Sequence, residues 1–150
     1  MFRLPWVLRK LQSLAPVERS VLFEAAALLP LVHAMQQALP FKRWRGLLEQ
    51  HEPPRAFGAV QPAPAQVAWA VETARRWVPG EYKCLPTAYT AHWLLHRHGH
   101  ASTIHVGVAR DAEGKVEAHA WVDCDGRTVV GEVADMERFV AFPALVTVRK

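Results

Sequence analysis

Cys84 and His119 are the two residues of this sequence whose types could together carry out nucleophilic catalysis. Cys84 follows a Pro79-Gly80 turn signal and stands where a helical pattern begins. A thiol at a helix N-terminus meets the positive end of the helix dipole and unpaired backbone N–H groups, and both favour the nucleophilic thiolate. The same N–H groups could bind an oxyanion. The alternative is that Cys84 is a small, buried apolar residue.

His119 lies in a segment that is predicted to form a β-hairpin. The Asp125-Gly126 pair is a strong signal for a two-residue hairpin loop. Such a loop pairs Cys124 with Arg127 and places His119 directly opposite Glu132. One face of the hairpin is then assigned to the core, with Ala118, Ala120, Val122, Cys124, Val129, Gly131 and Val133. The other face carries His119, Trp121, Asp123, Thr128, Val130 and Glu132.

Glu132 is therefore the predicted acid that orients His119. A general base held by a carboxylate is the arrangement that activates a thiol, so Cys84, His119 and Glu132 form a candidate catalytic triad. A shift of the register by one residue moves His119 to the other face of the sheet. In that case Asp135 and Asp123 are the alternative orienting acids. The alternative to catalysis is a surface ion pair between His119 and Glu132.

Four other residues are candidates to line a cleft near these groups. Trp77 and Tyr82 come shortly before Cys84, Trp121 shares the predicted face of His119, and His105 lies on an alternating segment. The alternative is that they are aromatic residues of the core or its rim.

A cluster of histidines, His92, His96, His98 and His100, raises the question of a metal site. His92 and His96 are four residues apart, which could place both on one zinc ion. However, the Glu of the zinc-peptidase helix motif does not follow His92. Histidines near a helix end are also typical of a solvated terminus that matches the helix dipole. We expect no metal and, without a glycine-rich phosphate loop, no cofactor.

The elements that must position these residues divide the chain into a helical half and a stranded half. Helices are expected over residues 6–14, 16–39, 43–50, 66–78 and 84–97, the last beginning at position 84 or 85. Pro30 is expected to kink or end the long second helix, and residues 51–64 to form a proline-rich connector. Strands are expected over residues 103–109, 116–124, 127–133 and 144–149.

This order of elements predicts an α+β fold. Residues 1–150 are expected to form one domain, with a helical part over about 1–80 and the nucleophile-bearing helix and antiparallel meander over about 81–150. Part of the apolar helical half could instead dock a partner or a membrane.

Composition argues against several functional classes. A net charge of +4 and a pI near 9.4 permit an acidic peptide partner but do not indicate nucleic-acid binding. Two cysteines favour a reducing compartment over a disulfide framework. The longest apolar stretch, residues 21–34, is interrupted by Glu24, Pro30 and His33 and is predicted to be too short for a membrane span. With no signal-peptide pattern, we expect a cytoplasmic protein without membrane association.

Several motifs give the chain a resemblance to a known family. These are Cys84-Leu85-Pro86, Gly99, His105-Val106-Gly107-Val108, Ala118-His119-Ala120-Trp121-Val122 and Asp125-Gly126. Together they resemble the transglutaminase-like peptidases of lasso peptide biosynthesis. These bacterial B proteins remove the leader from a ribosomally made precursor. The resemblance covers nearly the whole chain and is to the short version of the family, in which a separate small protein recognises the leader.

The resemblance implies roles for particular residues and partners. Cys84 matches the family nucleophile and His119 the catalytic histidine. The third member is usually an Asp on the strand after the hairpin, where this chain has Glu132. The implied fold is a transglutaminase/papain-like core. The implied substrate is a precursor peptide, and the implied partners are a leader-recognition protein and an ATP-dependent cyclase.

Two other functions use the same residues differently. A transglutaminase-like enzyme would pass the acyl group from Cys84 to an amine instead of water. A binding module with this fold would hold a peptide or partner without catalysis and would have no need of a reactive thiol facing a histidine.

Overall fold

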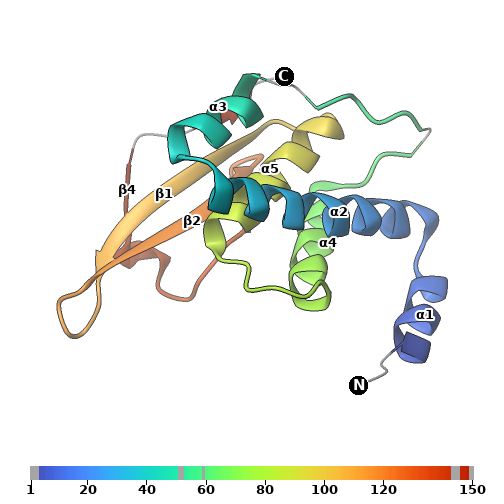
Figure 1. Ribbon diagram of the computed structural model, residues 1–150, viewed down its shortest axis with the longest axis horizontal. Helices are drawn as coiled ribbons and strands as arrows, with labels where there is room; N and C mark the ends of the chain where they lie inside the picture. Colours follow the sequence, from blue (N-terminus) through green and yellow to red (C-terminus); the bar gives the residue numbers. More distant parts are fainter. Residues whose placement is uncertain (1–3, 51–52, 59, 143–145, 149–150) are drawn as a thin grey trace.

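The computed structural model describes residues 4–50, 53–58, 60–142 and 146–148 (Figure 1). Its helices are α1 (Leu4–Ser13), α2 (Pro16–Ala38), α3 (Phe41–Gln50), α4 (Pro64–Trp77) and α5 (Cys84–Arg97). Its strands are β1 (Ser102–Arg110), β2 (Val116–Cys124), β3 (Arg127–Val130), β4 (Val140–Ala141) and β5 (Val146–Val148). A 3₁₀ turn, Met136–Arg138, lies between β3 and β4. The predicted α+β fold is confirmed.

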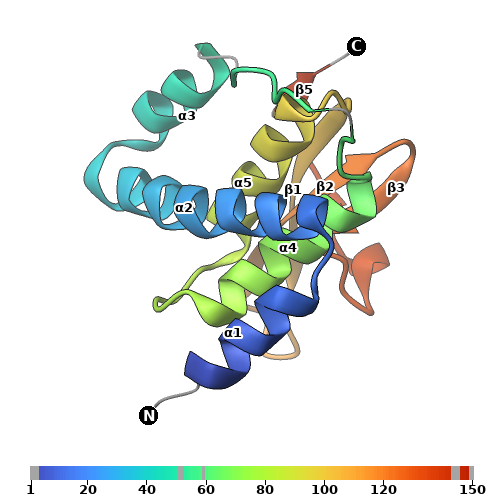
Figure 2. The same cartoon turned by 90° about the vertical axis from the view of Figure 1, so that its right-hand side faces the viewer.

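Helix α5 is the central element of the molecule, because it contacts α2 and α4 on one side and β1 and β2 on the other (Figure 2). Its buried residues include the predicted apolar face of Ala88, Ala91, Leu94 and Leu95. Pro86 sits in the first turn, where a missing N–H costs little. The helix is followed by Gly99 at φ 83°, a left-handed conformation that suits glycine.

Helix α2 runs without interruption through Pro30, so the expectation that Pro30 ends the helix is wrong, while a kink at Pro30 stays a prediction. Leu29 and Val32, on either side of Pro30, are fully buried in the core and help to hold the helix together. As one helix of 23 residues it is long and apolar enough to cross a membrane by length and composition. Core helices can meet the same criterion, and α2 packs against α4 and α5. Its other side exposes Phe23 and Leu31.

The strands form an antiparallel sheet in the order β3-β2-β1-β4, and β5 pairs with another part of β1. The predicted hairpin loop is confirmed. Cys124 pairs with Arg127, and Asp125 and Gly126 both have positive φ, 52° and 77°. Strand β5 covers the middle of the strand expected over 144–149, and the rest of that expectation lies outside the described residues.

A β-bulge after the hairpin loop makes the predicted register wrong beyond Asp123. Val122 pairs with Val130 instead of Val129, and β3 ends at Val130 instead of residue 133. The extra residue turns Val130 towards the core, where it is 3% exposed. Ala118, assigned to the core by the sequence, is exposed. His119 and Glu132 are therefore not a cross-strand pair.

Residues 131–142, named here the crossing segment, pass from β3 (labelled in Figure 2) at one edge of the sheet to β4 (labelled in Figure 1) beside β1. Arg138 fastens this segment: it donates to Asp135 at 2.8 Å, to Glu117 at 2.7 Å and to the Arg110 carbonyl at 2.9 Å. The Phe142 N–H bonds to the Val106 carbonyl at 2.8 Å. The crossing segment is thus attached to both β1 and β2.

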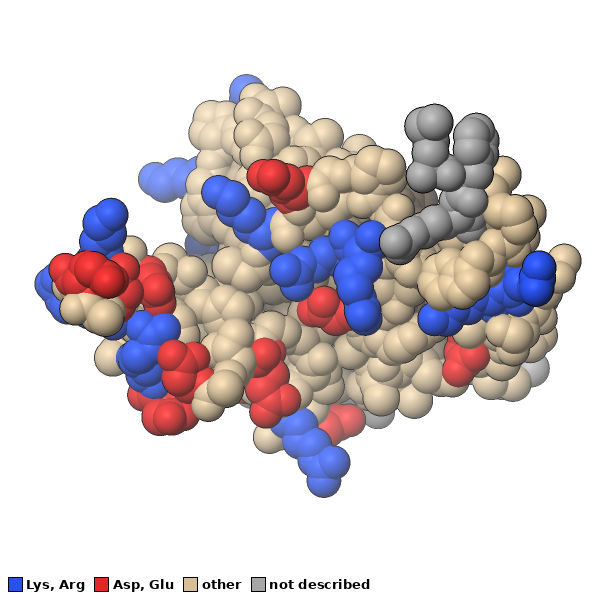
Figure 3. All heavy atoms as spheres, turned by 90° about the horizontal axis from the view of Figure 1, so that it is seen from below, with Lys and Arg blue, Asp and Glu red and all other residues tan. Residues whose placement is uncertain are grey.

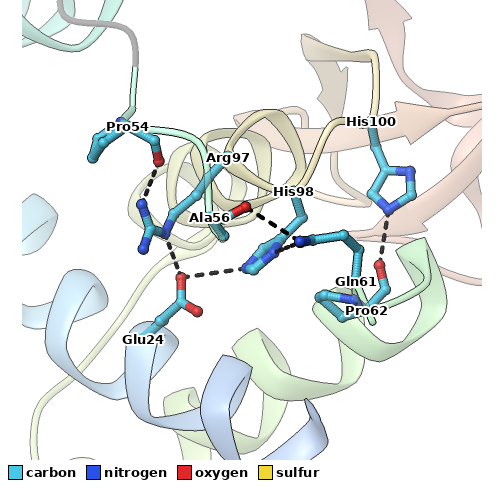
Figure 4. Close-up of polar contacts among 8 residues, drawn as sticks. All are labelled: Glu24, Pro54, Ala56, Gln61, Pro62, Arg97, His98 and His100. Atoms are coloured by element: carbon cyan, nitrogen blue, oxygen red, sulfur yellow. Dashed lines mark hydrogen bonds and ion pairs between the residues drawn. The ribbon is translucent and has the colours of Figure 1, made fainter. Parts of the chain in front are cut away.

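A polar cluster holds the C-terminal end of α5 (Figure 4). Arg97 and His98 both lie against the Glu24 carboxylate, at 2.8 and 3.3 Å, and His98 Nδ1 bonds to Gln61 at 2.7 Å. Burial raises the pKa of Glu24, but hydrogen bonds from His98 and Arg97 outweigh it and keep that pKa below its usual value. The cluster ties α5 to α2 and to the connector before α4.

The surface carries both signs of charge. Figure 3 shows one face on which Lys and Arg side chains are interspersed with Asp and Glu side chains. This distribution agrees with the modest net charge of +4.

Protonation of His92 should destabilise the protein at acid pH. His92 is buried on α5 and bonds through Nδ1 to Ser102 of β1 at 2.7 Å. Burial, with a smaller contribution from His96, lowers its pKa from 6.5 to about 4. The unfolded chain therefore takes up this proton at higher pH than the folded chain, so stability is complete above about pH 6.5 and is lost as pH falls towards 4. Urea unfolding should show a loss of about 2 kcal/mol between pH 7 and pH 5 from this residue.

The matched control is His92→Gln, whose amide can still bond to Ser102 but does not titrate. Its free energy of unfolding should fall less steeply with pH than that of the wild type. Equal slopes for the two proteins would show that His92 is not the group responsible.

Candidate active site

Cys84 is the first residue of α5 and is partly exposed. The first N–H groups of an α-helix have no partner within the helix. Here they belong to Cys84 and Leu85, and the side chain of Lys83 at the N-cap does not cap them. The sulfur therefore sits beside backbone donors and the positive end of the α5 dipole.

The turn before Cys84 is held by three contacts. Tyr82 donates its hydroxyl to the Pro79 carbonyl at 2.8 Å, and Arg75 of α4 donates to the Tyr82 carbonyl at 3.2 Å. Gly80, at φ 139°, passes so close to the Tyr82 ring that a Cβ would lie 2.8 Å from it. These contacts fix the point at which α5 begins and hence the position of the nucleophile.

His119 lies on β2 between two aromatic groups. Its ring stacks on Trp121 with centroids 6.2 Å apart, and it contacts Phe139 of the crossing segment at 5.5 Å. Trp121 is itself fixed, because it covers Gly107, where a Cβ would lie 3.0 Å from the indole. The imidazole is thus held from the sheet and from the crossing segment together.

The polar partner of His119 is a backbone carbonyl. His119 Nε2 lies 2.5 Å from the carbonyl oxygen of Gly131. A carbonyl can only accept, so Nε2 carries the proton, and in the neutral ring Nδ1 keeps a lone pair. Gly131 has φ 85°, and a Cβ there would meet the Ala120 carbonyl at 2.6 Å. Glycine at this position is what lets the backbone approach the ring.

Cys84 and His119 line the same pocket, which has a volume of 560 Å³. The pocket lies between the start of α5, the end of α4 and the segment after β3. Its other lining residues are Glu72, Arg75, Thr87, Val129, Val130, Gly131, Glu132 and Val133. The structure therefore brings together the predicted nucleophile and the predicted base in a partly polar cleft.

The three predicted orienting acids lie in different surroundings. Glu132 is exposed and lines the pocket, but among the described contacts the ring nitrogen of His119 bonds to Gly131 instead. Asp123 pairs with His105 at 3.1 Å and accepts a hydrogen bond from Thr128. Asp135 pairs with Arg138. Of the three predicted acids, Glu132 is the one that lines the pocket together with Cys84 and His119.

The four residues predicted to line the cleft lie outside the lining of this pocket. Trp77 packs edge-on against Trp6 of α1 at 5.9 Å, and Tyr82 is buried in the turn before α5. Trp121 is buried between the rings of His105 and His119, with the His105 centroid at 5.4 Å. Tyr82 and Trp121 therefore support Cys84 and His119 without lining the pocket.

Sequence reasoning missed the role of Gly131. A glycine inside a predicted strand is a signal for a bulge or for close approach of another group, so Val129-Val130-Gly131 offered a clue. Glu72 and Arg75 of α4 were also missed, because their approach to the pocket depends on how α4 packs beside α5.

The histidine cluster takes other roles. His92 bonds to Ser102, His98 to Gln61, and His100 Nε2 lies 2.8 Å from the Pro62 carbonyl. Within the described residues, no group of three or more His, Cys, Asp or Glu side chains is placed to hold a metal ion.

The transglutaminase-like superfamily model matches residues 21–143, a range that includes Cys84 and His119. Because the match spans most of the chain, this protein belongs to the transglutaminase-like superfamily. In general the superfamily comprises cysteine peptidases and acyl transferases. No curated protein and no solved structure matches the chain.

Gly131→Ala should lower the stability of the protein and disturb the orientation of His119. A non-glycine residue at positive φ costs about 1–2 kcal/mol, and the clash with the Ala120 carbonyl adds a further cost of about 1–3 kcal/mol. Relief of the clash should move the Gly131 carbonyl away from His119. Urea unfolding measures the lost stability, and the rate of Cys84 alkylation by iodoacetamide reports the state of the site.

Gly126→Ala is the matched control, since Gly126 has a similar φ of 77° but open space around it. It should show the strain cost alone and leave Cys84 alkylation unchanged. If the two variants lose the same stability and react alike, close packing at Gly131 is not the constraint described above.

Proposed function

We propose that this protein is a cysteine peptidase in which Cys84 is the nucleophile and His119 the general base and acid. The observation that carries the proposal is the placement of both side chains in one pocket, with the sulfur at a helix N-terminus and His119 Nε2 on the Gly131 carbonyl. A thiol beside backbone donors and an oriented imidazole is the combination that nucleophilic catalysis requires.

In the proposed reaction, His119 Nδ1 takes the proton of the Cys84 thiol, and the sulfur attacks the carbonyl carbon of the scissile peptide bond. The N–H groups of Cys84 and Leu85 stabilise the oxyanion. The C–N bond then breaks as His119 returns the proton to the leaving amine. A water molecule, deprotonated by the same nitrogen, attacks the acyl carbon of the acyl-enzyme. The C–S bond breaks, the product leaves as a carboxylic acid, and His119 gives the proton to the sulfur, which regenerates the thiol.

The opening of the pocket to solvent supports our proposal of hydrolysis rather than transfer to an amine. Two of its lining residues, Arg75 and Glu132, are exposed, so the pocket opens to solvent and water can reach the acyl-enzyme. An enzyme that transfers acyl groups must keep water out of the site during the second step. Mass analysis of the products separates the two reactions, because transfer adds the mass of the amine.

We infer that the substrate is a ribosomally made lasso precursor peptide, cut between leader and core. The basis is the resemblance in the motifs around Cys84 and His119 together with the superfamily match. On this proposal the protein works in the bacterial cytoplasm with a separate leader-recognition protein, and an ATP-dependent cyclase uses the freed amine.

Cys84→Ala should abolish cleavage of a precursor peptide while leaving the free energy of unfolding nearly unchanged, because Cys84 is partly exposed. The expected loss in rate is about 10³-fold or more, since covalent catalysis disappears. Mass spectrometry of the peptide products measures it, with the leader-recognition partner present in every sample. The control is Cys124→Ala, which removes the buried thiol and should keep activity in the protein that remains folded. Cleavage by the Cys84→Ala variant at the wild-type rate would refute the assignment of Cys84 as the nucleophile.

Glu132→Gln tests which group orients His119. Because the Gly131 carbonyl already fixes the ring, kcat/KM should fall by less than about tenfold, and its acid limb should keep its position on the pH axis. A fall of about 10³-fold or more would assign the orienting role to the carboxylate, as the sequence predicted. Asp123→Asn is the comparison variant, since Asp123 bonds to His105 and not to His119.

A further inference from the structure

A second pocket, different in character, adjoins Cys84 and His119. It has a volume of 260 Å³ and is bounded by α3, the start of α5, β1, β2 and the end of the crossing segment. Apart from Cys84 and His119, its lining is wholly apolar: Phe41, Leu85, Val106, Ala118, Ala120 and Phe142. An engineered apolar cavity of about 150 Å³ is enough to bind benzene, so this pocket can hold a large side chain.

The two pockets make the site asymmetric. The larger pocket presents the charged side chains of Glu72, Arg75 and Glu132, and the smaller one presents apolar walls. Cys84 and His119 belong to both linings and so lie at the boundary between them. A peptide whose scissile bond sits at this boundary can place one flanking side chain on the apolar side and the other on the polar side.

Resting on the proposed peptidase function, we propose that the apolar pocket is a specificity site for a large apolar or aromatic side chain next to the scissile bond. Transfer of such a side chain from water into an apolar pocket is favourable, whereas a charged side chain there would lose its hydration without a partner. The occupant is a residue of the substrate peptide, because the pocket is continuous with the nucleophile.

Two series of thiol-directed probes test the proposal without knowledge of the natural substrate. N-acetyl aminoacyl chloromethyl ketones present a side chain on the acyl side, and iodoacetyl amino acid amides present one on the amine side. In both, the Cys84 thiolate forms a C–S bond and displaces a halide. Each series carries Phe, Leu, Asn, Asp or Lys, and peptide mass analysis gives the rate constant for modification of Cys84.

Phe142→Ser is the test variant, and Phe23→Ser is its matched control. The two phenylalanines are similarly exposed, at 51% and 56%, but Phe142 lines the apolar pocket and Phe23 lies on α2. We expect the Phe and Leu probes of one series to react about tenfold faster than the Asn probe. Phe142→Ser should reduce that ratio at least threefold, and Phe23→Ser should leave it unchanged.

The outcomes separate this proposal from the function on which it rests. A preference below threefold in both series, or one that Phe142→Ser does not weaken, overturns the apolar specificity site while leaving the peptidase proposal standing. The peptidase proposal itself fails if Cys84 of the His119→Ala variant reacts as fast as Cys84 of the wild type with every probe and with iodoacetamide. The specificity site then fails with it.

Discussion

The hydrogen bond between His119 Nε2 and the Gly131 carbonyl is the contact on which the candidate site depends. It sets which ring nitrogen carries the proton, and it leaves Nδ1 as the one that can accept a proton from a thiol. The bond exists because Gly131 adopts φ 85° and passes within van der Waals distance of β2. That path begins at the β-bulge, where Val130 turns into the core. Packing at the edge of the sheet therefore determines the protonation pattern of the candidate base.

The crossing segment links this edge to the rest of the sheet. It supplies the Gly131 carbonyl at one end, the Phe139 ring beside His119, and Phe142 in the apolar pocket. Arg138 holds its middle part through exposed ion pairs with Asp135 and Glu117. Exposed ion pairs individually contribute little to stability. The position of the crossing segment therefore depends mainly on its aromatic contacts and on the pairing of β4 with β1. One short segment thus shapes both the base and the neighbouring specificity pocket.

Helix α5 supports the opposite side of the site by different means. Most of the helix is buried between the other helices and the sheet. Polar contacts add to this packing: His92 bonds to Ser102 of β1, and Arg97 and His98 pair with Glu24 of α2. Cys84 lies at the N-terminus of the helix and is partly exposed. A rigid body with one reactive end is well suited to placing a nucleophile, because catalysis is sensitive to small misplacements.

The sequence predicted local features better than tertiary ones. The patterns from Val67 to Ala74 and from Ala88 to Leu95 gave α4 and α5, and Asp125-Gly126 gave the hairpin loop, because helix periodicity and turn chemistry are encoded in adjacent residues. The partner of His119 could not be predicted in this way. A bulge is decided by whether Val129 or Val130 packs better against residues far away in the chain, and one inserted residue changes every pairing beyond it.

The continuity of α2 through Pro30 could not be predicted for a similar reason. The effect of Pro30 on α2 depends on the burial of Leu29 and Val32 against α4 and α5, which the local sequence does not reveal. The crossing segment was also missed, because 131–142 has little regular structure and gains its position from contacts with β1 and β2.

The most direct test of the central claim is the rate of Cys84 alkylation by iodoacetamide across pH, in the wild type and in His119→Ala, with Cys124 replaced by alanine in both. If the Cys84–His119 pair is preassembled as described, the wild-type thiol should react at lower pH than the variant thiol, and the difference should disappear when both are denatured. If Cys84 reacts identically in the two folded proteins, His119 does not act on the thiol, and the account of this site as a cysteine peptidase is wrong.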